Sequence, residues 1–377
     1  MSTLATNAIT DASGGNTASI NGYTPTMSNM AGRNRIINGA MVFDQRNAGA
    51  SVSLSGLAVT YTLDRWAIRN DTDAVVSVQQ SSVAPNGFTN SLLYTVTTAD
   101  SSLGASQNYS VQQRIEGFNM SDFGWGTASA QTVALSFWVR SSLTGTFGGA
   151  VSNSAANRSY PFTYTISSAN TWEQKTVTIA GDTLGTWLTT NGVGAYIYFS
   201  TGAGSTVSGT AGAWAGSDFR SATGATSVVG TSGATFYITG VQLEAGSVAT
   251  PFEHRQYGQE LALCQRYYQK TFAPDVKPAQ AAGTTGAIIM SDCGSSGYGT
   301  QLYWTFPVQM RANPTSVTTY NPISANAYAR NLSLPADASV TNTAYPSQRG
   351  VDVVAAGTNT GSAGHNLAVH ITAEAEL

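Results

Sequence analysis

The sequence predicts an all-β protein with four parts: an extended N-terminal arm, an antiparallel β-sandwich or jelly roll, a short connector helix and a smaller C-terminal β-domain. Three observations predict this class. Apolar and polar side chains alternate in many short runs, as they do in strands with one buried face. Stretches rich in Gly and Ser separate these runs. The sequence shows no repeat of fixed period, which disfavours a solenoid or a propeller.

The arm, residues 1–34, shows no hydrophobic periodicity, and its small polar residues do not bury enough apolar surface to fold alone. It is either a flexible tail or an arm that a partner orders. Four large apolar side chains favour the arm, because they would be unusual in a pure linker. These candidate contact residues are Ile20, Tyr23, Met27 and Met30.

Residues 35–254 are predicted to form the sandwich. The odd-numbered residues of 133–139 are apolar, and 109–116 and 193–200 repeat this alternation, so one face of each strand is buried. The opposite face carries aromatic, arginine and amide side chains. Its candidate residues are Gln112, Arg114, Trp138, Arg140, Tyr196 and Tyr198.

Residues 255–270 carry the one convincing helix pattern, with apolar side chains at i, i+4, i+7 and i+11. This connector lies between Pro251 and Pro274. Its apolar stripe has to pack on something, and copies of the same helix in an oligomer would cover it. The candidate oligomer-interface residues are Tyr257, Leu261, Cys264 and Tyr268.

Residues 271–377 return to β patterning and are predicted to form the second, smaller β-domain. The clearest strand is the last one, where apolar residues at the odd-numbered positions of 367–377 alternate with residues such as His370 and Glu374.

Charge excludes two classes of partner. Only 10% of the residues are charged, the formal net charge is −3, and no run of Lys or Arg occurs. Binding to nucleic acid or to an anionic membrane surface needs such basic runs.

No apolar stretch approaches the roughly 20 residues of a membrane span, and the first ten residues do not resemble a secretory signal. The two cysteines, Cys264 and Cys293, either form a disulfide or stay reduced in the cytosol; the sequence favours the second.

The search for catalytic motifs predicts no enzyme and no cofactor. The chain lacks a phosphate-binding loop and a GxSxG elbow, and its three histidines are scattered. Six acidic residues of the sandwich are candidates for a hydrolytic pair, but their turn-like contexts favour a structural role. They are Asp64, Glu116, Asp122, Asp182, Asp218 and Glu244. No metal site is predicted, and Glu244, with Asp44 and Asn38 nearby, is a weak candidate for Ca²⁺.

The aromatic face of the sandwich is the strongest candidate binding site. Aromatic rings stack on the apolar faces of sugars, and planar polar groups bind the hydroxyls, so this face is typical of glycan recognition. Two tryptophans in Gly-flanked loops, Trp125 and Trp214, would extend it at one end of the sandwich. The alternatives are that the face packs on a neighbouring subunit or that both faces of the sheet are buried.

Several segments taken together resemble bacteriophage and prophage tail-fibre proteins that carry a jelly roll similar to a carbohydrate-binding module. The segments that carry this resemblance are 10–22, 34–41 with 44–46, 62–66 (TLDRW), 135–140 (LSFWVR), 238–246 (ITGVQLEAG), 251–268 and 306–314 (FPVQMRANP).

The resemblance implies a virion protein of the tail, assembled in the host cytoplasm as a homotrimer. Residues 1–34 would attach to other virion proteins, and the distal domains would bind a bacterial surface glycan. One alternative is a structural tail adaptor or decoration protein without receptor binding. A polysaccharide-degrading tail protein is a further alternative, although the chain lacks the repeated rungs of a β-helix.

Overall fold

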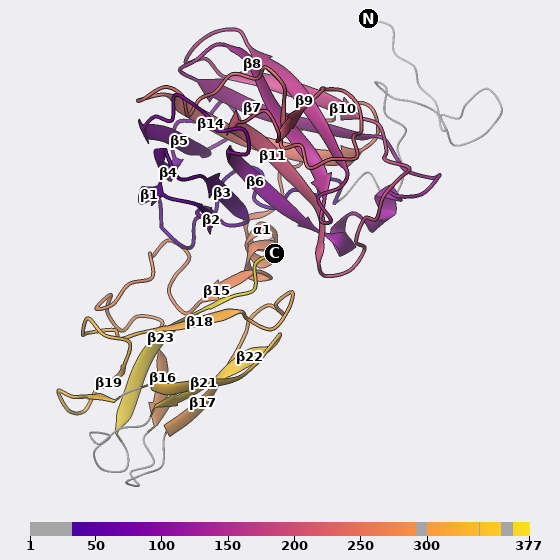
Figure 1. The fold of residues 1–377 in the computed structure, drawn as a ribbon. Coiled ribbons are helices and arrows are strands. Elements are labelled where there is room, and N and C mark those ends of the chain that lie inside the picture. Colours follow the sequence, from indigo (N-terminus) through magenta and orange to yellow (C-terminus); the bar gives the residue numbers. More distant parts are fainter. Residues whose placement is uncertain (1–31, 292–299, 339, 356–364) are drawn as a thin grey trace, which may run out of the picture.

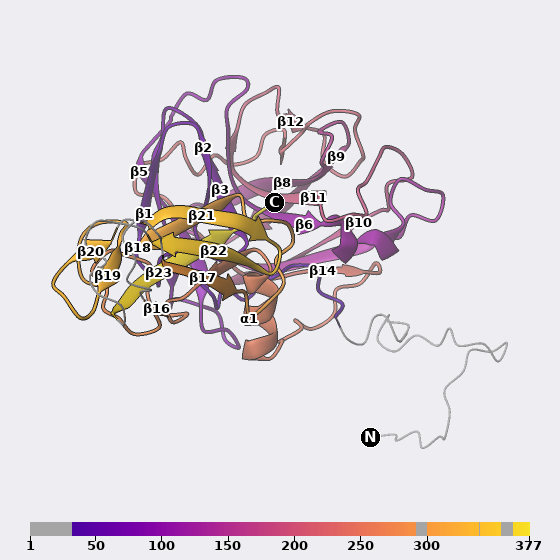
Figure 2. The ribbon, with the colours of Figure 1, turned by 90° about the horizontal axis from the view of Figure 1, so that it is seen from below.

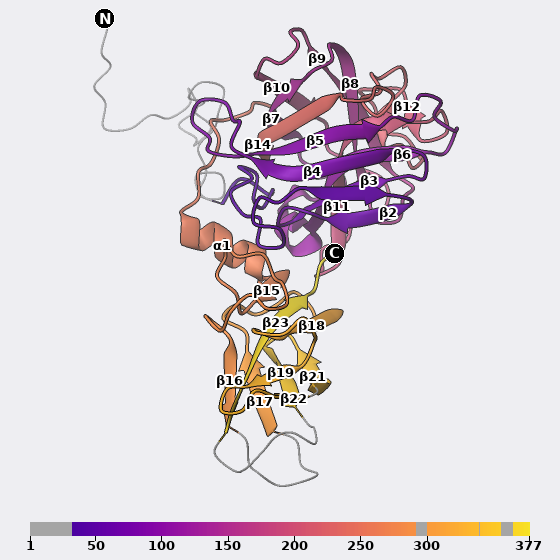
Figure 3. The ribbon, with the colours of Figure 1, turned by 90° about the vertical axis from the view of Figure 1, so that its left-hand side faces the viewer.

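The computed structural model describes residues 32–291, 300–338, 340–355 and 365–377. They form two β units, one above the other in Figure 1, with helix α1 (Tyr257–Gln265) between them. The same arrangement is clear after a quarter turn (Figure 3). Strands dominate both units, so the all-β prediction is confirmed.

The N-terminal unit is a sandwich of two six-stranded antiparallel sheets. In spatial order, sheet I contains β1 (Val52–Ser55), β4 (Val75–Ser81), β5 (Ser91–Thr98), β14 (Thr235–Ala245), β7 (Val133–Ser141) and β10 (Glu173–Ile179). Sheet II contains β2 (Ala58–Tyr61), β3 (Trp66–Asn70), β6 (Asn108–Glu116), β11 (Val193–Ala203), β8 (Gly145–Asn153) and β9 (Ser159–Ile166).

The sandwich core follows the alternation read from the sequence. Val133, Leu135, Phe137 and Val139 of β7 are fully buried, and so are the inward residues of β6 and β11. The two sheets therefore pack through their apolar faces and leave two outer faces for polar and aromatic side chains. Smaller elements connect the sheets: 3₁₀ turns Gly117–Asn119 and Ser121–Phe123, and the parallel pair β12 (Ser208–Gly209) and β13 (Ser221–Ala222).

The C-terminal unit is organised around β23 (Asn366–Glu374), the last strand. Four strands pair directly with it, and β20 (Asp337–Ala338) extends β19; the four are β15 (Tyr268–Lys270), β16 (Ile288–Ser291), β18 (Ser316–Tyr320) and β19 (Ala329–Asn331). A second sheet contains β17 (Thr300–Thr305), β22 (Gly350–Ala355) and β21 (Val340–Ser347). In the view from below, these strands lie over one side of the sandwich (Figure 2).

Helix α1 is shorter than the predicted 255–270. It ends at Gln265, and Tyr268–Lys270 form β15, which pairs with β23. The apolar spacing that suggests a longer helix does not decide the outcome, because tertiary pairing overrides local propensity and adjacent tyrosines also suit a strand. Residues 268–270 therefore belong to the C-terminal unit.

Buried ionic contacts join the two units. The carboxylate of Glu116, at the end of β6, accepts two hydrogen bonds from the Arg266 guanidinium (2.9 and 2.6 Å) and one from the Tyr267 hydroxyl (2.6 Å). Arg65 is 1% exposed; it lies 3.5 Å over the Tyr267 ring and forms an ion pair with Glu376. The junction therefore uses charges that are scarce elsewhere in the chain.

Asp44 lies near this junction and is buried. Loss of solvation raises its pKa to about 6, the N–H groups of Gly49 and Asn47 that bind it act in the opposite direction, and the negative charge of Asp64 raises the pKa further. Lys270, which donates to the carbonyl of Gln45 from the C-terminal unit (2.7 Å), has its pKa lowered to about 8 by burial.

Replacing Glu116 with Ala should lower the free energy of unfolding by about 3 kcal/mol, because Arg266 and Tyr267 lose their shared buried acceptor. Urea denaturation followed by fluorescence measures this. The matched control is Asp122→Ala, which breaks the ion pair with Arg35 (2.6 Å) at a side chain that is 48% exposed and should cost less than about 1 kcal/mol. Equal losses in the two variants would show that the junction adds nothing special.

Stability should depend on the Asp44 carboxyl between about pH 4 and pH 6. In this range folded Asp44 keeps a proton that the unfolded chain, with a pKa near 3.8, has released. Its contribution to the free energy of unfolding is therefore full below about pH 4 and falls as the pH rises through 6. Urea titrations at several pH values should show a smaller fall in stability for Asp44→Asn than for the wild type, and an equal fall in both would contradict this assignment.

Candidate functional site

A hollow of about 140 Å³ opens on the outer face of sheet II. We call it the cleft. Strands β2, β3, β6, β8 and β11 form its floor, and the turn between β8 and β9 and the loop that follows β12 supply its remaining walls. Its lining residues are Val59, Arg69, Gln112, Arg114, Ser152, Asn153, Ser154, Ala156, Tyr196, Tyr198, Asp218 and Arg220.

Two tyrosines of β11 form the centre of the cleft. Tyr196 and Tyr198 are two residues apart, so both point out of the sheet on the same side. Their rings stack with centroids 5.6 Å apart and planes 5° apart. Arg114 lies opposite Tyr196 in the β6–β11 register and places its guanidinium 5.5 Å from that ring, while Arg220 lies 5.9 Å from the Tyr198 ring. Two cations therefore flank the stacked rings.

The side chains that line the cleft differ in how much of their surface is exposed. Gln112 and Tyr198 are only 3% and 5% exposed, whereas Tyr196, Arg114 and Arg220 are half-buried. Burial raises the pKa of the Tyr198 hydroxyl, which therefore stays protonated as a hydrogen-bond donor. The cleft offers hydroxyl and guanidinium donors beside aromatic surface, which suits binding of a polar ring.

The C-terminal unit contacts one lining residue of the cleft, Arg114. The Arg114 guanidinium donates to the main-chain oxygen of Leu377, and so does the Tyr61 hydroxyl (2.9 Å). The Arg114 carbonyl in turn accepts a hydrogen bond from Arg65 (2.6 Å). The position of Arg114 therefore depends on the junction between the two units.

The structure divides the predicted aromatic face into two. Gln112, Arg114, Tyr196 and Tyr198 meet in the cleft, but Trp138 and Arg140 lie on the outer face of sheet I. The single platform predicted from the sequence is wrong, because β7 pairs with β10 and β14, whereas β6 pairs with β3 and β11.

Trp138 instead lines an open groove of about 580 Å³ with Phe88, Phe252 and His254. Gly240, at a bulge in β14 with φ of 61°, lets Phe88 and Trp138 approach, since a Cβ there would lie 2.7 Å from the Phe88 ring. Arg140 lies 4.8 Å from the ring of Tyr237, on the same sheet.

Trp125 and Trp214 do not form an open platform. Together with Trp187 they form a cluster with ring centroids 4.7–5.4 Å apart. Trp125 is buried and donates to the carbonyl of Gln131 (2.8 Å), while Trp214 donates to that of Ala180 (2.7 Å). These indole groups stabilise one end of the sandwich. The assignment of the buried Trp125 to glycan binding is therefore corrected, whereas Trp214 is partly exposed and its assignment stays a prediction.

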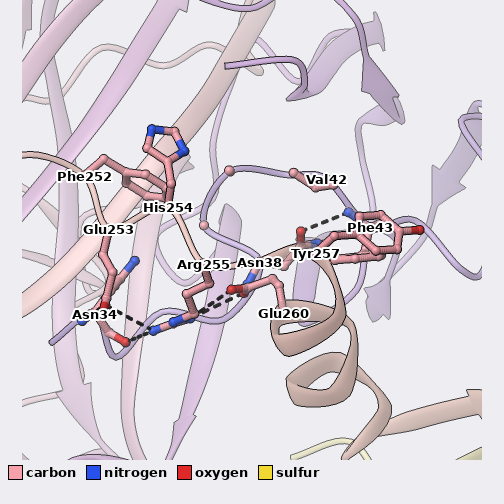
Figure 4. A pocket seen from close by; sticks show the side chains of 12 residues that line it. Asn34, Asn38, Val42, Phe43, Phe252, Glu253, His254, Arg255, Tyr257 and Glu260 are labelled. Carbon is pink, nitrogen blue, oxygen red and sulfur yellow. Dashed lines mark hydrogen bonds and ion pairs between the residues drawn. The ribbon is translucent and has the colours of Figure 1, made fainter. Parts of the chain in front are cut away.

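A third hollow, of about 220 Å³, lies where the N-terminal segment meets α1 (Figure 4). In that view Arg255 points between Asn34 and Glu260; it donates to the Asn34 carbonyl and to the Glu260 carboxylate (3.1 Å). Phe43 packs against Tyr257 with centroids 4.7 Å apart. The polar groups that line this hollow are hydrogen-bonded to one another. We therefore interpret the hollow as the place where two segments of the chain pack together.

The apolar stripe of α1 packs largely within its own chain. Cys264 is buried with Ile37, Phe43 and Tyr267, Leu261 packs against the same cluster, and Tyr268 is buried in β15. Because Cys264 and Tyr268 are covered, their assignment to an oligomer interface is corrected; Tyr257 is 60% exposed. Ile20, Tyr23, Met27, Met30 and Cys293 lie outside the described residues.

Each of the six candidate carboxylates accepts a hydrogen bond from another residue of the protein. Asp182 binds Arg158 in a bidentate pair (2.8 and 2.6 Å), and Asp218 binds Arg220 (2.6 Å). Asp122 binds Arg35, Asp64 binds Gln45, and Glu116 binds Arg266. Glu244 accepts from Gln242 and from the N–H and hydroxyl of Thr250, so protein donors engage the weak Ca²⁺ candidate.

The described residues contain no group of three or more His, Cys, Asp or Glu arranged to hold a metal ion. Within the same residues, no helix is long and apolar enough to cross a membrane.

Sequence reasoning missed Arg69, Ser152, Asp218 and Arg220 as cleft residues. Arg69 had a signal, since Trp66 and Ile68 alternate with it and face the core. Asp218 and Arg220 lie in an irregular polar stretch between β12 and β13, and no periodicity marks them.

No protein-family model matches the chain, and no curated protein matches it. Among solved structures, the enzymatically active domain of tailspike protein 4 of bacteriophage CBA120 is 14% identical with a TM-score of 0.30, over 56% of this chain and 21% of that one.

Two carbohydrate-binding modules of Clostridium thermocellum show similar figures. The C-terminal family 22 module of Xyn10B is 15% identical with a TM-score of 0.28, over 49% of this chain and 89% of the module. The family 11 module of Lic26A-Cel5E is 12% identical with a TM-score of 0.26, over 54% and 100%. Similarity at this level does not place the chain in a family.

Proposed function

We propose that this chain is a bacteriophage tail-fibre protein that binds a bacterial surface glycan through the cleft. The observation that carries the proposal is the convergence of Gln112, Arg114, Tyr196 and Tyr198 in one hollow. The sequence resemblance to tail-fibre proteins supports the setting: a homotrimer in the virion tail, assembled in the host cytoplasm and attached to other virion proteins through residues 1–34.

The size of the cleft limits what it holds. At about 140 Å³ it is smaller than the roughly 300 Å³ at which sites for drug-sized ligands begin, so it receives one sugar residue of a longer chain. One such contact is weak. Several copies of the cleft on one fibre raise the overall avidity through effective concentration, without any new contact.

We also propose that the protein binds without cleaving. Glycoside hydrolysis ordinarily needs two carboxyl groups across the scissile bond. Of the residues that line the cleft, Asp218 is the one acid, and it is paired with Arg220.

The second candidate function is a structural adaptor in which the same face is an assembly interface. The cleft favours glycan over this function because a stable protein interface buries about 800 Å² on each partner. Gln112 and Tyr198 are already covered by their own chain, and the cleft itself is a hollow of only about 140 Å³.

Replacing Tyr196 with Ala should weaken binding to host polysaccharide about tenfold, or by about 1.4 kcal/mol, because the accessible ring surface is lost. Surface plasmon resonance on purified polysaccharide measures this. The matched control is Tyr328→Ala, at a tyrosine 46% exposed in the C-terminal unit, which should bind as the wild type does.

Trp138→Ala serves as a second comparison. If polysaccharide binding were lost in this variant and kept in Tyr196→Ala, the glycan site would lie on sheet I. The adaptor function predicts another result: Tyr196→Ala would disrupt the oligomer, seen by light scattering, with no sugar binding to lose. Release of new reducing ends during incubation would overturn the non-enzymatic part of the proposal.

A further inference from the structure

The charges around the cleft differ from those of the whole chain. The chain has a formal net charge of −3, yet three arginines line the cleft against one aspartate. Asp218 pairs with Arg220 (2.6 Å), and Asp71 approaches Arg69 at 3.8 Å from outside the lining. The main-chain oxygen of Leu377 accepts from Arg114, and no aspartate or glutamate side chain among the described residues forms an ion pair with it.

The faces of the two tyrosine rings are partly occupied. The rings stack on each other, and the Arg114 and Arg220 guanidinium groups lie 5.5 and 5.9 Å from the ring centroids of Tyr196 and Tyr198. A neutral sugar that binds mainly by lying on a free ring face finds less surface here than on an isolated ring. The groups that a ligand meets instead are guanidinium N–H groups and tyrosine hydroxyls.

The arginines also retain donors without acceptors. The Nε–H groups of Arg69 and Arg114 are buried and have no hydrogen-bond partner within the described part of the chain. The side chains of Arg69 and Arg220 are each 25% exposed, so part of each guanidinium remains open to the cleft. An anion in the cleft meets the exposed parts of the Arg69 and Arg220 guanidinium groups, and guanidinium matches the geometry of carboxylate and phosphate.

We propose that the sugar residue bound in the cleft is acidic, carrying a carboxylate or a phosphate group that the cleft arginines hold. This inference rests on the proposed glycan-binding function and names the chemical class of its ligand. The anionic group lies against the exposed part of the Arg220 guanidinium, and the tyrosine hydroxyls bind the ring hydroxyls. Asp218 opposes this ligand, because its carboxylate competes for Arg220.

The test compares probes that differ only in charge. Full-length protein is titrated by calorimetry with tetragalacturonate and with its carboxyl-reduced, neutral counterpart. An array of uronate-bearing, phosphate-bearing and neutral oligosaccharides separates the two sources of negative charge. We expect at least tenfold tighter binding of the acidic member of each pair that binds, and weaker binding as salt rises from 50 to 500 mM.

Two single variants give effects of opposite sign. Arg220→Gln should weaken binding of the acidic probe about tenfold, and Asp218→Asn should strengthen it several-fold because the competing carboxylate is gone. The matched controls are Arg330→Gln and Asp337→Asn, which alter a similar Arg–Asp pair (3.1 Å) in the C-terminal unit and should change nothing.

The outcomes separate this inference from the proposed function. Equal binding of acidic and neutral probes, lost in Tyr196→Ala, overturns the acidic ligand and keeps the glycan site. Weaker binding of the acidic probe by Asp218→Asn also overturns the acidic ligand. Binding to no member of the array overturns the glycan function and this inference together.

Discussion

The contact on which the two-part architecture depends is the buried carboxylate of Glu116. It ends a central strand of sheet II and takes its three hydrogen bonds from Arg266 and Tyr267, the residues that lead from α1 into the C-terminal unit. A charge placed in a dry interior is costly unless its lone pairs are filled, and it then tolerates little change in the position of its donors. Together with the Arg65–Glu376 ion pair, this carboxylate holds the two units in one relative position. Only 10% of the residues are charged, and several of these charged side chains lie at the junction.

The same junction shapes the cleft. Arg65 reaches from the sandwich to Glu376 and also donates to the carbonyl of Arg114, while the Arg114 side chain turns between Tyr196 and Leu377. The second unit therefore contacts a lining residue of the cleft, Arg114, through Leu377, which is 263 positions away in sequence. A sandwich separated from its C-terminal unit would keep the stacked tyrosines but lose the contact that orients the arginine beside them.

The sequence predicted well what depends on neighbouring residues and poorly what depends on topology. Alternation in 109–116 and 193–200 placed Gln112, Arg114, Tyr196 and Tyr198 on an outer face, and the structure brings these four together. The same alternation correctly predicted that Trp138 faces outward. Alternation carries no information about which strands pair, however, so Trp138 was assigned to the wrong sheet. The tryptophans near Trp187 seemed exposed because glycines flank them, and only the fold shows that they cover one another. The arginine of the irregular loop, Arg220, has no periodic signal at all.

The central place of β23 has a consequence for biosynthesis. A nascent chain leaves the ribosome from its N-terminus, and domains generally fold as units in that order. The sandwich has all its strands once residue 245 has emerged, but β15, β16, β18 and β19 wait for their shared partner at 366–374. The pairing of Arg65 with Glu376 spans 311 positions and forms later still. Until residues 366–374 emerge, the strands that pair with β23 have unpaired edges, a state prone to aggregation, and the contact that orients Arg114 beside the cleft waits for the segment that follows β23.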